Sequence, residues 1–100
     1  MCEGGDVSAN GGKSIYGDTF PDENFILRHE PGSVAMSNSG KDSNKSRFYI
    51  CLSKAEWMDG KHVVFGRVVS DLRIVKNMEA YAGDGGAPRE ELVISDCGMV

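Results

Sequence analysis

The segment that most constrains the fold of this chain runs from residue 47 to residue 66 and reads RFYICLSKAEWMDGKHVVFG. Its first part alternates in polarity, which predicts a strand whose two faces meet different surroundings. One face carries Phe48, Ile50 and Leu52, and the other carries Tyr49, Cys51 and Ser53. Asp59-Gly60 indicates a turn, and Val63-Val64-Phe65 behind it predicts a second, short buried strand. Tyr49, Trp57 and His62 thus lie on neighbouring apolar segments. This arrangement predicts the wall of an apolar groove for a small hydrophobic ligand.

Charge and composition exclude several kinds of partner. The net charge is -4 and the pI is near 5.0, and no Lys or Arg residues are clustered. Because phosphate neutralisation needs such clusters, we expect binding neither to nucleic acid nor to an anionic membrane surface. The sequence has no apolar run of about 18 residues and no pattern of a secretory signal at its N-terminus. The expected location is therefore cytoplasmic.

The cysteines and histidines give no sign of a metal centre. Cys2, Cys51 and Cys97 are odd in number, share no CxxC spacing and lie in or beside apolar runs. We therefore expect buried, reduced thiols. His29 and His62 have no carboxylate or Cys at metal-ligand spacing, so no metal site is expected.

The order and spacing of residues 47–66 closely resemble the cyclophilin family of peptidyl-prolyl cis-trans isomerases, whose pattern here is FxIC…EWxDGKHVVFG. Residues 1–6 (MCEGGD) resemble the family's FMxQGGD strand entered at its second residue, and residues 11–17 resemble its GGKSIYG loop. Phe20, residues 22–25 (DENF), residues 34–38 (VAMSN) and residues 96–98 (DCG) follow in family order. The resemblance spans essentially all 100 residues, and the part of the family domain ahead of Met1 has no counterpart in this sequence.

The resemblance implies one domain over residues 1–100 with a mostly β fold, a cyclophilin-like antiparallel β-barrel that is incomplete here. From the residues themselves we expect exposed loops at 4–18 and 37–46, which are rich in Gly, Ser, Asn, Asp and Lys. Short extended segments are expected at Asn24–His29 and Ser33–Met36.

One long α-helix is expected near residues 71–82. Ser70 or Asp71 can cap it, its apolar residues keep a spacing of three and four, and Gly83 can end it. Its apolar positions are Leu72, Ile74, Val75, Met78 and Tyr81. Leu92–Ile94 is expected to begin the last strand.

The candidate site residues come from the same resemblance. By composition alone, Phe48, Tyr49 and Trp57 would be core aromatics, but the family positions matched by Tyr49, Trp57 and His62 line the proline pocket and its rim. The resemblance makes Tyr49 and His62 the catalytic candidates. The remaining positions matched to the substrate groove are Met1, Glu3, Ser37, Asn38, Arg47 and Met58. Tyr49 stands where the family usually has Phe, so its hydroxyl needs water or a polar partner.

Proline isomerisation sets modest chemical demands. Rotation about a peptide bond costs roughly 18–20 kcal/mol because resonance must be broken, and no nucleophile, metal or cofactor is needed. A dry pocket for the pyrrolidine ring and hydrogen bonds that favour the twisted amide suffice. In the family the principal donor is an arginine on the strand ahead of the FMxQGGD segment, which has no counterpart here. Losing such a donor costs roughly 2.7–4 kcal/mol, so impaired catalysis is expected.

Two charged residues depart from the family pattern near the same place. Glu3 replaces a Gln, and Arg47 replaces a second Gln that lines the groove. They are either a compensating ion pair or two independent changes toward surface charge. A third interpretation is that Arg47 supplies the missing donor.

Three hypotheses of function follow from these observations. The first is an isomerase acting on proline-containing peptides or proteins. The second is a module that binds proline peptides or cyclosporin without turnover. The third is an interaction fragment or a non-functional product, because absent strands would leave Val34, Ile50 and Val64 uncovered. The strand edges would then be open to self-association or to a partner strand.

Overall fold

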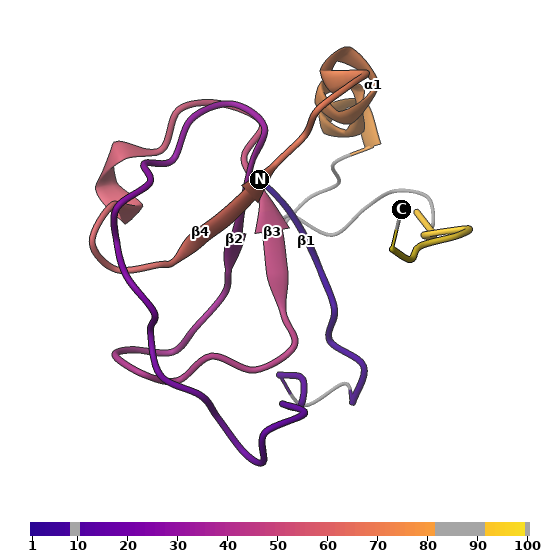
Figure 1. Ribbon diagram of the computed structural model, residues 1–100. Helices are drawn as coiled ribbons and strands as arrows, with labels where there is room; N and C mark the ends of the chain where they lie inside the picture. The colour runs from indigo at the N-terminus through magenta and orange to yellow at the C-terminus, as the bar shows by residue number, and fades with distance from the viewer. Residues whose placement is uncertain (9–10, 82–91, 100) are drawn as a thin grey trace.

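The strands of the chain form one antiparallel sheet in the order β1-β3-β2-β4, which Figure 1 shows at the centre of the molecule. The computed structural model describes residues 1–8, 11–81 and 92–99. The strands are β1 (Cys2–Gly4), β2 (Ser33–Met36), β3 (Phe48–Ile50) and β4 (Val64–Arg67). The helical elements are the 3-10 turn η1 (Glu56–Met58), the α-helix α1 (Leu72–Lys76) and the 3-10 turn η2 (Asn77–Tyr81). The expected mostly β fold is confirmed as an open sheet.

The two faces of the sheet differ in burial, as the alternation at residues 48–53 predicted. In β3, Tyr49 is buried while Phe48 and Ile50 are half-buried. Ala35 lies opposite both Tyr49 and Val64 in the register, so these side chains share one face. The buried cluster on that face consists of Ala35, Tyr49, Cys51, Ala55 and Val64, with Met58 packed against it. The core is therefore on the face of Tyr49 and Cys51.

The expectation that Val64 would be uncovered is wrong, because Val64 is only 5% exposed and belongs to this core. Val34 and Ile50 lie on the opposite face, where they pair in the register and are half-buried. The bulge between Val34 and Ala35 shifts the pairing with β4, so that Val64 lies opposite Ala35. The uncovered apolar face is thus carried by Val34 and Ile50 without Val64.

The expected extended segment Asn24–His29 is not a strand. Its main-chain groups bond to side chains instead of a neighbouring strand: the N–H of Ile26 donates to Asn24 Oδ1 at 3.2 Å, and that of His29 donates to Asp59 Oδ1 at 2.8 Å. The carbonyl of His29 accepts from Ala55 N at 3.2 Å. Residues 20–31 therefore pass beside the η1 turn (Figure 1), and His29 from this segment stacks on Tyr49 of the core.

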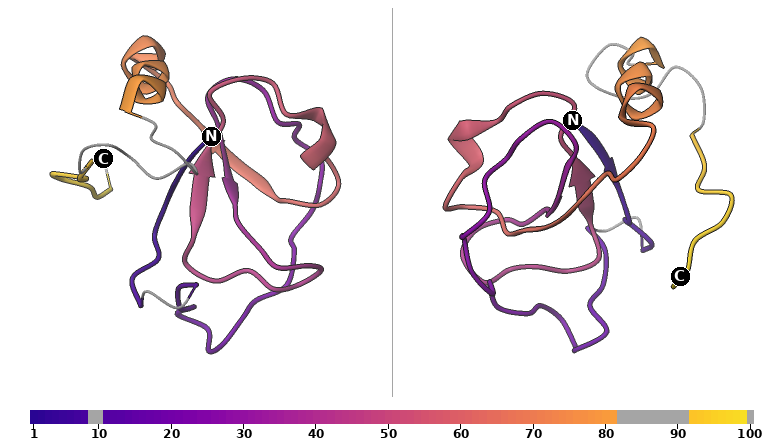
Figure 2. Two further views of the ribbon diagram at one scale, coloured as in Figure 1. Left: turned by 180° about the vertical axis from the view of Figure 1, so that it is seen from behind. Right: turned by 45° about the horizontal axis from the view of Figure 1, so that its top comes forward.

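The helical segment begins where the sequence predicts, but its α-helical part is shorter than the expected helix at 71–82. α1 ends at Lys76 and continues as the 3-10 turn η2, and neither element has a buried residue. Asp71 occupies the N-cap position in a left-handed conformation (φ 59°) without a side-chain cap. Because a short helix draws its stability mainly from packing, a segment standing beyond the end of the sheet gains little (Figure 2). Gly83 lies outside the described residues.

Two expectations about the C-terminal residues are wrong. Leu92, Val93 and Ile94 form no strand and are 42%, 70% and 64% exposed. Cys97 is an exposed free thiol, whereas Cys51 is buried as expected and Cys2 is half-buried. Apolar composition predicted both features, but residues 92–99 pair with none of the four strands of the sheet, so nothing there buries their side chains.

Ser46 ties the first loop to the beginning of β3. Its Oγ donates to the Gly5 carbonyl at 2.6 Å and accepts from Lys13 N at 2.9 Å. Gly5 and Gly12 both have positive φ, and a Cβ on either would overlap an atom of Ser46. Glycine at these two positions therefore lets the loop approach Ser46 closely.

Within the described residues, no helix has the length and apolarity to cross a membrane.

Candidate functional site

Tyr49 is anchored from behind by a buried histidine. Its Oη lies 2.6 Å from His29 Nε2, and the two rings are stacked with centroids 5.8 Å apart. His29 is 1% exposed, and its Nδ1 lies 2.8 Å from Asp59 Oδ1. Burial, followed by the nearby Cys51 and Asp59, raises the pKa of Tyr49 well above its ordinary value of 10.0. The hydroxyl that sequence analysis left without a partner thus stays protonated and binds His29.

His62 lies on the accessible side of Tyr49. The two rings meet edge to face with centroids 5.7 Å apart, and His62 Nδ1 lies 3.2 Å from the Met36 carbonyl oxygen. Since a carbonyl only accepts, this nitrogen carries the proton. Tyr49 is 3% exposed and His62 is part-buried, so His62 presents the accessible surface and Tyr49 its backing.

Asn38 and His62 line one pocket of about 490 Å³. Asn38 Nδ2 donates to the Lys61 carbonyl at 2.9 Å, and its Oδ1 accepts from Gly40 N at 3.2 Å. The bond to Lys61 joins the loop after β2 to the turn before β4, and the bond from Gly40 lies within that loop. The other residues lining this cavity, which we call the His62 pocket, are Asp22, Phe25, Gly40, Lys41, Gly60 and Lys61.

The charged residues Glu3 and Arg47 form an ion pair at the side of the sheet. Arg47 Nη1 lies 3.4 Å from Glu3 Oε1, and Ser37 Oγ donates to Glu3 Oε2 at 3.3 Å. The side chains of Arg47 and Glu3 are 26% and 49% exposed, so the pair is worth about 1 kcal/mol or less. In the register Glu3 lies directly opposite Tyr49, which places the pair on the strands that carry the candidate site.

The remaining predicted residues are not gathered with these two groups. Trp57, on η1, is 68% exposed, and Met1, just before β1, is 58% exposed. Met58 packs against the core cluster. The structure therefore brings Tyr49, His62 and Asn38 together, and separately Glu3, Arg47 and Ser37, while Trp57 and Met1 lie at the surface.

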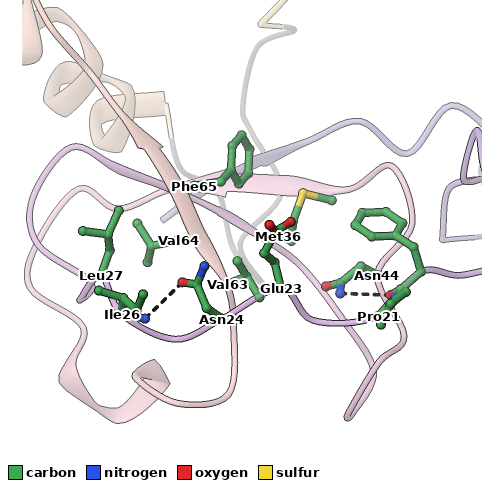
Figure 3. A pocket seen from close by; sticks show the side chains of 11 residues that line it. Pro21, Glu23, Asn24, Ile26, Leu27, Met36, Asn44, Val63, Val64 and Phe65 are labelled. Atoms are coloured by element: carbon green, nitrogen blue, oxygen red, sulfur yellow. Dashed lines mark hydrogen bonds between the residues drawn. The ribbon is translucent and has the colours of Figure 1, made fainter.

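A second pocket of about 470 Å³ lies elsewhere, between residues 20–27 and β4 (Figure 3). Apolar side chains such as Ile26, Leu27 and Val63 line most of it. Asn44 Oδ1 is buried there without a hydrogen-bond partner, while its Nδ2 donates to Phe20 O at 3.1 Å and Asp22 Oδ1 at 2.8 Å. None of the predicted site residues lines this pocket, so it carries none of the chemistry assigned above.

Sequence reasoning missed His29 and Asp59. It considered His29 only as a metal ligand, and among the described residues no group of three metal-binding side chains occurs. Asp59 lies 30 positions away and was interpreted only as part of a turn. No local spacing in the sequence reveals such a pair.

The open antiparallel sheet fits an incomplete β fold of the cyclophilin type. The chain matches the family described as "Cyclophilin type peptidyl-prolyl cis-trans isomerase/CLD" over residues 1–99. It therefore belongs to the cyclophilin family, which confirms the resemblance seen in the sequence.

Proposed function

We propose that this chain binds X-Pro segments of peptides and proteins at the His62 pocket and catalyses their cis-trans isomerisation at a reduced rate. One observation carries the proposal. Asn38 and His62, which match substrate positions of the family, line the same pocket, and Tyr49 packs edge-on behind His62. Phe25 adds an apolar surface to this cavity. Membership of the isomerase family supports the reaction class.

The reduced rate follows from the hydrogen-bond donors available. Catalysis needs a donor that strengthens its bond to the prolyl nitrogen as the amide twists. Arg47, the suggested substitute for the family's arginine, directs its guanidinium at Glu3. This favours a second candidate function, binding of proline peptides or of cyclosporin without turnover. Ligand burial contributes about 25 cal/mol per Å² of apolar surface and does not depend on that donor.

The test measures binding and turnover on one preparation of the 100-residue chain. Titration with an Ala-Pro peptide should shift the NMR signals of His62 and Asn38, and a matched Ala-Ala peptide should not. Exchange spectroscopy on the same sample gives the isomerisation rate. We expect binding with kcat/KM at least about 10²-fold below that of a complete cyclophilin domain. Near-normal turnover would refute the impairment, and equal shifts with both peptides would refute proline recognition.

The partners and the location of the protein are further parts of the proposal. We place the protein in the cytoplasm, acting on proline-containing client proteins. β1 and β4 are the outer strands of the four-stranded sheet, so we also propose self-association through these edges.

A further inference from the structure

A row of hydrogen-bonded side chains runs from the surface to the back of the candidate site. Asp59 Oδ1 accepts from the main-chain N–H of His29 at 2.8 Å and also lies 2.8 Å from the ring Nδ1 of the same residue. The other ring nitrogen of His29 lies 2.6 Å from Tyr49 Oη. Tyr49 then meets the ring of His62 edge to face, and His29 does so too at 6.4 Å.

The direction of each hydrogen bond follows from the chemistry of its acceptor. The hydrogen bonds from the His29 ring and main chain hold the pKa of Asp59 below its ordinary range, so its carboxylate is ionised and only accepts. His29 Nδ1 therefore carries a proton, and in the neutral imidazole this leaves Nε2 as the acceptor for the Tyr49 hydroxyl. Asp59 thus selects the ring tautomer that receives a hydrogen bond from Tyr49.

We propose that His29 and Asp59 are positioning residues that fix Tyr49, and through its ring fix the orientation of His62 at the proline-peptide pocket. The inference rests on the proposed function of that pocket. Tyr49 is held at two places, by its hydroxyl and by the stacked face of His29, and His62 is held between the Tyr49 ring and the Met36 carbonyl. A ligand meeting His62 therefore meets a ring whose position is set before binding, which lowers the ordering cost of association.

A purely structural role makes a different prediction from a positioning role. If the row only satisfies buried polar atoms, removing it lowers stability and leaves the affinity of the folded chain unchanged. If the row positions His62, the affinity for a proline peptide falls as well. Because Asp59 acts through the hydroxyl of Tyr49, its effect on affinity should vanish once that hydroxyl is absent.

The experiment combines nitrogen-15 NMR of the histidine rings with peptide titration of four proteins. These are the unsubstituted chain, Tyr49→Phe, Asp59→Asn and the double variant. In the unsubstituted chain we expect a protonated Nδ1 and an unprotonated Nε2 on His29, with a Tyr49 hydroxyl proton protected from exchange. Asp59→Asn should reverse the tautomer or shift both signals, and it should move the ring signals of His62.

For an Ala-Pro peptide, each single variant should raise Kd about three- to tenfold, and the double variant should be no weaker than Tyr49→Phe alone. Tyr16→Phe is the matched control, because Tyr16 is 74% exposed in a loop. Unchanged Kd together with unmoved His62 signals in the single variants would overturn the proposal. If the unsubstituted chain binds no peptide, the proposed function fails, while the tautomer and His62 signals still decide whether the row positions the ring.

Discussion

Asp59 holds His29 at two points with a single oxygen, since its Oδ1 bonds both to the main-chain nitrogen and to the ring Nδ1, each at 2.8 Å. The first hydrogen bond fixes the backbone of the segment 20–31, and the second fixes the buried ring of His29. The turn before β4 and residues 20–31 are thereby joined at the most buried histidine of the described chain.

Acid should weaken this junction in a defined pH range. The ordinary pKa of the aspartate is 3.8, and the hydrogen bonds from His29 lower it in the folded chain. Between these two values the unfolded chain binds more protons than the folded chain does. The stabilisation is therefore fully present above pH 3.8 and is lost as the pH falls through the lowered pKa.

Urea unfolding of the unsubstituted chain and of Asp59→Asn between about pH 2.5 and pH 7 measures this loss. The difference in unfolding free energy should be constant near neutrality and shrink below about pH 4. Asp18→Asn is the control, since the Asp18 side chain is 90% exposed. A difference that stays the same at every pH would contradict the role of the Asp59 charge.

Alkali should act on Tyr49, which bonds to the other ring nitrogen of His29. The folded chain keeps Tyr49 protonated beyond its ordinary pKa of 10.0, whereas the unfolded chain ionises there. Stability should therefore fall as the pH rises above 10.0. Thermal unfolding at increasing pH should show a steep decline for the unsubstituted chain and a flatter one for Tyr49→Phe. An equal decline in both proteins would show that another group is responsible.

The ion pair of Glu3 and Arg47 should be measurable but weak. In a double-mutant cycle with Glu3→Gln and Arg47→Gln, we expect non-additivity in stability of at least about 0.5 kcal/mol at low salt, since both side chains are partly shielded. The coupling should decrease in about 0.5 M salt, where surface charges are screened. Additive effects at low salt would leave the two charges as independent changes.

The open sheet should make the chain associate. Phe65 is 56% exposed on β4, an outer strand of the sheet, and the face of Val34 and Ile50 is only half covered. Sedimentation should show self-association that Phe65→Lys reduces, because a charge on an edge strand opposes pairing. Val69→Lys, at an 86% exposed position outside the strands, is the control. A monomer with an unfolding midpoint above roughly 65 °C would contradict this prediction.

Local pattern predicted the central strands well. The alternation at residues 48–53 identified β3, and the apolar run after Asp59-Gly60 identified β4, although Phe65 in that run is 56% exposed and not buried as expected. Local pattern failed where the formation of a strand or helix depends on packing against another element. Leu92–Ile94 has the composition of a strand but no place in the sheet, and the helix after Asp71 lacks the packing that would extend its α-helical part.

The candidate site was predicted only in part, for the same reason. The motif located Tyr49, His62 and Asn38, which the fold brings together. It could not show that the Tyr49 hydroxyl is buried against His29, because His29 lies 20 positions away in the sequence. Trp57 was expected at the pocket rim; it is an exposed residue of η1 and is not among the residues that line the His62 pocket.

The Ser46 hydroxyl, which bonds to Gly5 across a separation of 41 residues, has a consequence for the order of folding. The shape of the glycine loop is specified from outside the loop, by a residue that is synthesised much later. During translation, which adds about 5–20 residues per second, Gly5 and Lys13 lack this hydrogen-bond partner until Ser46 leaves the ribosome. The glycine loop therefore takes its shape only after Ser46 has been made, although its own residues are made earlier.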